Sequence, residues 1–159
     1  MRSPSRPPLV RARGGARAPT TLPRKRRLRV LASLPMLDHV SLGVRDLARS
    51  IRFYDAVLAA IGKVRVWTYD HGAGYGDAGG EDRLAIFSKP ETHAAGAGFH
   101  LALTAGSTAE VDAFHAAALA QGGSDLGAPG PRPRYGPGYY AAFVHDPDGD
   151  KLEVVHHGS

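Results

Sequence analysis

HVSLGVRDLARSIRFYDAVLAAIG, residues 39–62, aligns without a gap with HLALTAGSTAEVDAFHAAALAQGG, residues 100–123. The offset is 61 residues, and eight of the 24 aligned positions are identical. Alanine accounts for several of the matches, but the match of His39 with His100 is harder to attribute to chance. A repeat of this length predicts two copies of one supersecondary unit.

Each copy has the pattern of a strand, a short turn and a helix. In the first copy, Val40, Leu42 and Val44 alternate with polar or small residues, at the two-residue period of a half-buried strand. Asp46 is suited to cap the helix that follows, whose apolar residues recur every three or four positions up to Gly62. We expect the helix to cover the apolar face of the strand, which leaves the histidine that begins each copy on the opposite face.

Four further segments have the composition of short strands. They cover residues 63–69, 83–88, 139–145 and 151–156. Between the last two lies Asp146-Pro-Asp-Gly149, a turn fixed by its proline, so these two strands are expected to form an antiparallel hairpin. The sequence therefore predicts two βα-plus-hairpin halves in an α+β fold with mostly antiparallel pairing.

Composition limits the class of protein. The chain has 159 residues, of which 43% are hydrophobic and 22% charged, so it is long enough for one globular domain and too short for two independent ones. No apolar run reaches the roughly 18 residues that a membrane helix requires, which favours a soluble protein. Because the chain has no cysteine, disulfide scaffolds, thiolate metal sites and cysteine nucleophiles are excluded, and any metal must be held by His, Asp or Glu.

The net charge of +5 is unevenly distributed along the chain. Residues 1–35 contain ten Lys and Arg and no acid, whereas residues 36–159 set the other ten bases against all 15 acids, a net charge of −5. Since the second part is mildly acidic, we expect no nucleic-acid and no membrane partner. We interpret residues 1–35, rich in Pro, Arg and Gly, as a basic disordered extension, and residues 36–159 as the single domain. A basic binding arm, a nuclear signal, a transit peptide or dispensable sequence ahead of Met36 are the alternatives for the extension.

Three residues have the chemistry of a metal site. His39, His100 and Glu153 each lie on an expected strand beside apolar residues that suit the helix-covered face, so all three belong on the other face. Two imidazoles and one carboxylate hold a divalent metal and leave coordination positions open. Taken singly, each is better interpreted as a hydrogen-bonded histidine or a surface glutamate. The repeat favours the metal site, because it makes the two histidines equivalent.

Three other motifs have simpler interpretations. Residues 74–79 match the letters of a dinucleotide-binding fingerprint, but a short strand follows where a helix is required, so we interpret them as a glycine-rich hairpin loop. The aspartates of residues 146–150 lack the glycine and glutamate positions of a calcium loop. Residues 127–138 are a connector or a binding loop, in which Arg132 and Arg134 would meet a substrate carboxylate or phosphate.

Three segments together resemble the vicinal oxygen chelate superfamily. They are LDHVSLGVRDLARSIRFYDAVL at residues 37–58, FHLALTA at residues 99–105 and YYAAFVHDPDGDKLEVV at residues 139–155. This superfamily includes glyoxalase I, extradiol dioxygenases, methylmalonyl-CoA epimerase, fosfomycin-resistance thiol transferases and bleomycin-resistance proteins. The resemblance covers residues 36–157 and implies two βαβββ modules, about residues 36–90 and 98–157, that pair into a mostly antiparallel, cup-shaped sheet.

The resemblance also implies a metal site and an assembly. It places a divalent metal, which would be Fe, Mn, Ni, Co or Zn, on His39, His100 and Glu153, and it implies a homodimer. Glyoxalase I and the epimerase have a fourth ligand at a position that falls near Ile86, where this sequence offers no carboxylate or amide. This departure favours a three-ligand site like that of the dioxygenases, or a cavity used for binding alone.

Two functions remain open. The first is a cytoplasmic, metal-dependent enzyme of lyase, isomerase or dioxygenase type that acts on a small substrate with vicinal oxygens. The second is a metal-free binding protein of the bleomycin-resistance type that sequesters a drug or metabolite. The candidate acid, base or orienting groups are Tyr75, Tyr140 and His145. The candidate substrate contacts are Trp67, Tyr69, Phe87, Arg132, Arg134 and Tyr139.

Overall fold

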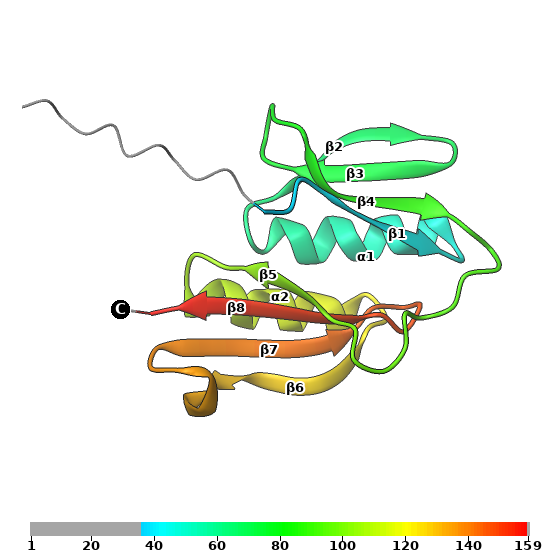
Figure 1. The fold of residues 1–159 in the computed structure, drawn as a ribbon. Coiled ribbons are helices and arrows are strands. Elements are labelled where there is room, and N and C mark those ends of the chain that lie inside the picture. Colours follow the sequence, from blue (N-terminus) through cyan, green and yellow to red (C-terminus); the bar gives the residue numbers. More distant parts are fainter. Residues whose placement is uncertain (1–35, 159) are drawn as a thin grey trace, which may run out of the picture. The chain divides into compact units, whose positions relative to one another are not determined.

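The computed structural model describes residues 36–158, so the expectation of a disordered basic extension at residues 1–35 lies outside the described residues. Figure 1 shows two modules with the same order of elements. Module 1 consists of β1 (Val40–Val44), α1 (Leu47–Ala59), β2 (Val64–Tyr69), β3 (Gly72–Gly76) and β4 (Asp82–Ser88). Module 2 consists of β5 (Leu101–Thr104), α2 (Thr108–Ala120), β6 (Ser124–Pro131), the short 3₁₀ helix η1 (Pro133–Tyr135), β7 (Tyr139–His145) and β8 (Lys151–His157).

The two sheets have the same topology. Their strand orders are β1-β4-β3-β2 and β5-β8-β7-β6. The first strand of each module pairs in parallel with the last, and the other pairs are antiparallel. Both bounds of α2 lie 61 residues after those of α1, which is the offset of the sequence repeat. The predicted α+β fold of two βαβββ modules is confirmed, although within the described residues the strands form two separate four-stranded sheets rather than one closed cup.

Two strands rich in glycine were predicted wrongly. Residues 74–79 were expected to be a hairpin loop and residues 127–138 a connector or a binding loop, yet β3 includes residues 74–76 and β6 extends to Pro131. In β3 the glycines stand where large side chains of neighbouring strands need room. A Cβ atom on Gly74 would collide with the Trp67 indole, and one on Gly72 would lie 2.8 Å from the Phe87 ring. Aromatic rings from β2 and β4 therefore fill the space that side chains on β3 would otherwise occupy. The hydrophobic alternation of the β3 sequence does not reveal this arrangement.

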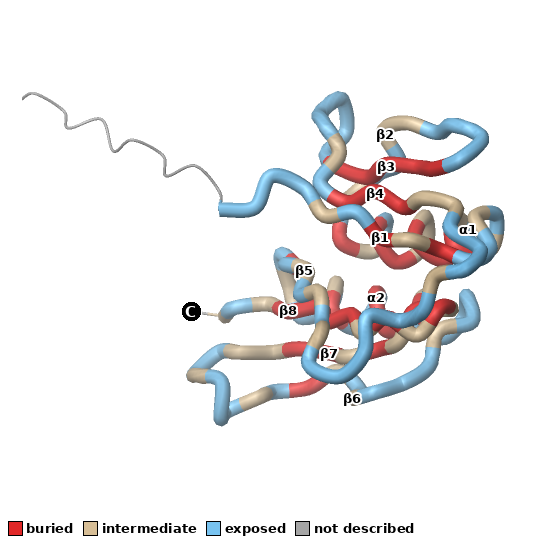
Figure 2. The backbone as a smooth tube through the Cα atoms, turned by 45° about the vertical axis from the view of Figure 1, so that its right-hand side comes forward, coloured by how far each residue is buried: buried red, intermediate tan, exposed pale blue. Residues whose placement is uncertain are grey.

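The helices and the inner faces of the two sheets share one core (Figure 2). Each helix begins at a side-chain cap: Asp46 accepts from the backbone N–H of Arg49, and Ser107 accepts from that of Glu110. The equivalent residues Phe53 and Phe114 are fully buried, and α1 packs directly against α2. The helix-facing residues of both modules therefore pack together, and each sheet keeps one face that its own helix does not cover. We call this second face the open face of the module.

The turn between β7 and β8 joins the modules, and we call residues 146–150 the docking turn. Asp146 accepts from the hydroxyl of Tyr54 on α1 at 2.8 Å and from two backbone N–H groups of its own turn. Asp148 accepts from the Arg45 backbone and from the side chains of Arg45 and Arg49. The corresponding turn of module 1, residues 77–81, is exposed. The expected proline-fixed turn is confirmed, and its carboxylates also hold module 2 against the start of α1.

The docking turn is expected to make the free energy of unfolding depend on pH in the acid range. Burial alone would raise the pKa of Asp148, but hydrogen bonds and positive charge from Arg45 and Arg49 outweigh it and hold that pKa below the ordinary 3.8. A carboxyl whose pKa is lowered in the folded state stabilises the fold above its ordinary pKa, and this contribution is lost as the pH falls through the folded-state value. Below about pH 4 we expect the free energy of unfolding to drop more steeply in the wild type than in Asp148→Asn. Urea unfolding at a series of pH values measures this, and parallel curves for the two proteins would contradict it.

Candidate functional site

The best-formed polar site lies on the open face of module 2. Leu152 and Val154 point into the core, so Glu153 between them points to the open face, where only 4% of its side chain is exposed. The Nε2 atom of His100 lies 3.3 Å from the Oε2 atom of Glu153. The structure thus brings two of the three expected metal ligands together, one immediately before β5 and one from its partner strand β8.

Tyr139 holds the other oxygen of the same carboxylate. Its hydroxyl donates to Oε1 of Glu153 at 2.5 Å, and its ring lies edge-on to His157 with centroids 4.9 Å apart. Burial and the hydrogen bond to Glu153 raise the pKa of Tyr139 to about 12. The hydroxyl therefore stays protonated at neutral pH and keeps donating. Tyr139 was expected to contact substrate, whereas here it orients the carboxylate, a role that sequence could suggest only through the two-residue alternation of β7.

His39 occupies the equivalent place in module 1 and has a different partner. Its Nδ1 atom lies 2.9 Å from Oδ2 of Asp38, which can only accept, so Nδ1–H donates and Nε2 keeps its lone pair. The hydrogen bond from His39 lowers the pKa of Asp38, and the charge of Arg83 acts in the same direction. A carboxylate on the second nitrogen is the usual partner of a metal-binding histidine. Asp38 stands next to His39 in the sequence and was not considered as a site residue.

Within residues 36–158 of one chain, no three His, Asp or Glu side chains come close enough to hold a metal ion. The strand register also corrects the position expected for a fourth ligand. Ala85 pairs with Ser41 as Glu153 pairs with Ala102, so Ala85 and not Ile86 is the counterpart of Glu153. Ala85 carries no donor atom either, so a site built on these strands has three protein ligands at most.

The three expected acid, base or orienting groups are divided between the two faces. Tyr75 is buried among the helix-facing residues, where burial and the charge of Asp55 raise its pKa. Tyr140 also points to the helix side and donates to Asp112 on α2 at 2.9 Å. Neither lies on the open face with Glu153. His145 does lie on that face, at the far end of β7, with its Nδ1 atom 3.5 Å from the Ser124 hydroxyl.

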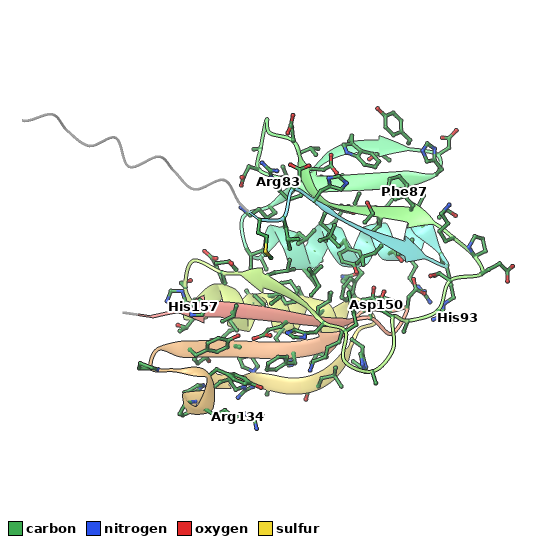
Figure 3. The ribbon with its side chains drawn as sticks, viewed as in Figure 1. Arg83, Phe87, His93, Arg134, Asp150 and His157 are labelled. Carbon is green, nitrogen blue, oxygen red and sulfur yellow. The ribbon has the colours of Figure 1, made fainter. Side chains whose placement is uncertain are left out.

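The expected substrate contacts fall into two groups. Trp67, Tyr69 and Phe87 come together on the open face of module 1, where they also contact His71. Arg132 instead packs over the Phe143 ring of module 2 and donates to a backbone carbonyl of β6. Arg134 lies on η1, in the other module from Phe87 (Figure 3). The structure therefore assembles the aromatic residues but does not bring the two arginines to them.

Comparison with known proteins defines the family. The family model described as "Glyoxalase/Bleomycin resistance protein/Dioxygenase superfamily" matches residues 36–154. A crystal structure of a glyoxalase/bleomycin resistance protein from Albidiferax ferrireducens T118 is 35% identical, with a TM-score of 0.66, and the match covers 78% of this chain and 100% of that one. The chain belongs to this superfamily, as the sequence predicted.

Two other solved structures show the range of relatives. A glyoxalase I variant from Zea mays is 29% identical with a TM-score of 0.56, and the match covers 75% of this chain and 45% of that one. A protein from Agrobacterium tumefaciens is 25% identical with a TM-score of 0.57 over 79% of this chain and all of the other. No curated protein matches the chain. In the part of the chain that the structure describes, no helix is both long and apolar enough to cross a membrane.

Proposed function

We propose that the protein is a metal-dependent enzyme that acts on a small substrate through two vicinal oxygens, in a reaction of lyase, isomerase or dioxygenase type. The observation that carries this proposal is the pairing of His100 with the buried Glu153. A carboxylate removed from water needs hydrogen bonds or a cation. Tyr139 supplies a hydrogen bond to one oxygen, and the imidazole faces the other. This is the arrangement of two ligands that converge on one ion.

We propose that the third ligand, His39, comes from a second copy of the chain. Among the strands of residues 36–158, β1 pairs only with β4 and β5 only with β8, so each is an edge strand of its sheet. Unpaired edges favour association with another chain. If β1 of one copy lies beside β5 of another, the histidine at the start of β1 approaches the pair in module 2. The homodimer would then hold two equivalent sites, as a twofold interface requires.

The residues of such a site would have separate roles. A bound Fe, Mn, Ni, Co or Zn ion would supply Lewis acidity, or dioxygen chemistry in the case of iron. Tyr139 fixes Glu153, and Asp38 fixes the ring of His39 with Nε2 free, so the ligands are oriented before a metal binds. With three protein ligands, coordination positions remain for two oxygens of a substrate. The aromatic residues on the open face of module 1 would contact the rest of that substrate.

Elemental analysis and mixed dimers test this proposal. We expect about one metal ion per chain in the native protein, and almost none in either His39→Ala or Glu153→Ala alone. A mixed dimer of the two variants, purified through two different tags, keeps one site with all three ligands. It should therefore hold about half the metal of the wild-type dimer.

Three results would contradict parts of the proposal. Mixed dimers without metal would show that the site is not shared between copies. A monomer at micromolar concentration in sedimentation would exclude the dimer. Wild-type protein that is isolated without metal, and that takes up none of the five ions at neutral pH, would exclude the metal-dependent enzyme.

The second candidate, a metal-free binding protein, is favoured by a specific observation. One chain brings together only two of the three ligands among its described residues, whereas it does assemble four aromatic side chains on module 1. A protein that sequesters a small molecule needs such a surface and no metal. The metal analysis decides between the two candidates.

A further inference from the structure

The open face of module 1 carries a closed ring of four aromatic side chains, and we call these residues the aromatic cluster. Trp67 lies 5.3 Å from Tyr69 and 5.9 Å from Phe87 between ring centroids, and His71 lies 5.8 Å from Tyr69 and 6.1 Å from Phe87. The planes of Tyr69, His71 and Phe87 are nearly parallel, at 9° and 16°. These spacings are in the range of offset-stacked aromatic pairs.

Glycines on β3 leave room for two rings of the aromatic cluster. The Trp67 indole occupies the space above Gly74, and the Phe87 ring lies against Gly72. The rings are nevertheless not buried: Tyr69 is 62% exposed, His71 is exposed, and Trp67 and Phe87 are partly exposed. A contiguous exposed aromatic surface costs solubility, which is why such surfaces usually mark a binding site.

Module 2 offers an internal comparison. In module 1, Trp67 on β2 pairs with Gly74 on β3, and in module 2, Gly127 on β6 pairs with Phe143 on β7. One aromatic ring therefore covers one glycine in each sheet, but the strands that carry the ring and the glycine are exchanged. In module 2 the Phe143 ring is covered by cations, with Arg132 at 5.6 Å and the Lys151 ammonium at 4.9 Å from its centroid. Within residues 36–158, no cation lies over a ring of the aromatic cluster. The equivalent surface is thus capped by the protein in one module and left uncapped in the other.

We infer that the aromatic cluster binds a flat aromatic or heteroaromatic ring, which defines the substrate class of the proposed site and rests on that proposed function. The faces of aromatic rings favour another flat ring by about 0.5–1.5 kcal/mol per pair beyond area burial. A puckered saturated ring of the same size gains only the area term.

The test uses benzamide and cyclohexanecarboxamide, which share a neutral amide and differ in whether the ring is flat. Trp67 is the only tryptophan in the chain, so its fluorescence reports directly on the cluster. In the full-length protein with a chelator present, we expect a saturable change with benzamide, and binding of cyclohexanecarboxamide that is about 5-fold weaker or more. Tyr69→Leu and Phe87→Leu should each reduce this preference, whereas Phe143→Leu should keep it. Tyr69 is exposed, so its variant tests the inference even if Phe87→Leu does not fold.

The results separate this inference from the proposed function. Equal affinity for the two amides, the absence of a saturable change with either, or equal loss of preference in Phe143→Leu would overturn the inference. Metal uptake by a protein that does not distinguish the amides would leave the enzyme proposal standing alone. A preference for benzamide in a protein that takes up no metal would keep the inference and favour the binding protein.

Discussion

Glu153→Gln is expected to lower the affinity of the protein for its metal by more than about 100-fold, because loss of an outer partner alone costs about 10–100-fold. Glutamine has the shape of glutamate and can still accept from Tyr139, so the fold and the hydrogen bond at Oε1 are preserved. What it removes is the negative charge and the second carboxylate oxygen, which faces His100. Metal titration followed by elemental analysis measures the effect. Unchanged affinity would show that Glu153 is not a ligand.

Two neighbouring tyrosines provide the matched control for the role of the carboxylate. Tyr139→Phe removes the hydroxyl that holds Glu153, and we expect it to weaken metal binding by about 10–100-fold while the absorption spectrum of bound Co(II) changes. Tyr140→Phe removes a hydroxyl that donates to Asp112 on the other face of the same strand. It should leave both the affinity and the spectrum unchanged. Equal effects of the two variants would mean that Tyr139 acts only through stability.

The repeat and its helices could be predicted because the signals are local. A cap, an apolar stripe with a period of three or four and a closing glycine all lie within one segment, and the two copies reinforce each other. The same repeat placed His39 and His100 at equivalent positions, and the alternation around Glu153 placed it on the open face. These predictions needed only the direction in which a side chain points.

The strands β3 and β6 could not be predicted in this way, since each has glycine where an aromatic ring of a neighbouring strand lies. Gly72 and Gly74 look like a flexible loop in the sequence, yet both are buried under rings from other strands. The correct counterpart of Glu153, Ala85, required the pairing register, which a bulge in the β3–β4 hairpin shifts by one residue. A one-residue shift moves a side chain to the other face of a sheet.

The role of the docking turn was also missed, because it depends on contacts between distant segments. The sequence identifies residues 146–150 as a turn, and three aspartates in a turn would ordinarily be solvated. Asp146 and Asp148 are instead buried against residues about 90–100 positions earlier, namely Tyr54, Arg45 and Arg49. Such pairings become visible only when the two modules are packed together.

Asp146→Ala is expected to destabilise the fold by about 3–5 kcal/mol, because it leaves three donors without an acceptor. These donors are the Tyr54 hydroxyl, which is fully buried, and the backbone N–H groups of Asp148 and Asp150. Burial raises the pKa of Asp146, and the hydrogen bonds from Tyr54 and the turn oppose that shift only in part. Burial of this carboxyl therefore costs desolvation free energy, which the three hydrogen bonds that it accepts offset in part. Asp146→Ala loses those hydrogen bonds. Chemical unfolding followed by circular dichroism measures the change.

Asp77→Ala is the matched control, since the strand register places Asp77 at the same position of the turn in module 1. Asp77 is exposed, and its carboxylate forms a surface ion pair with Lys63, so this variant should unfold at nearly the same urea concentration as the wild type. Tyr54→Phe removes the hydroxyl donor itself, so no buried donor is left without an acceptor. This variant should therefore cost much less than Asp146→Ala. If Asp146→Ala and Asp77→Ala were equally stable, the docking turn would not hold the modules together. A large effect of Asp146→Ala beside little effect of Asp77→Ala would show that the Asp146 carboxylate stabilises this chain through Tyr54 and the two N–H groups of the turn together.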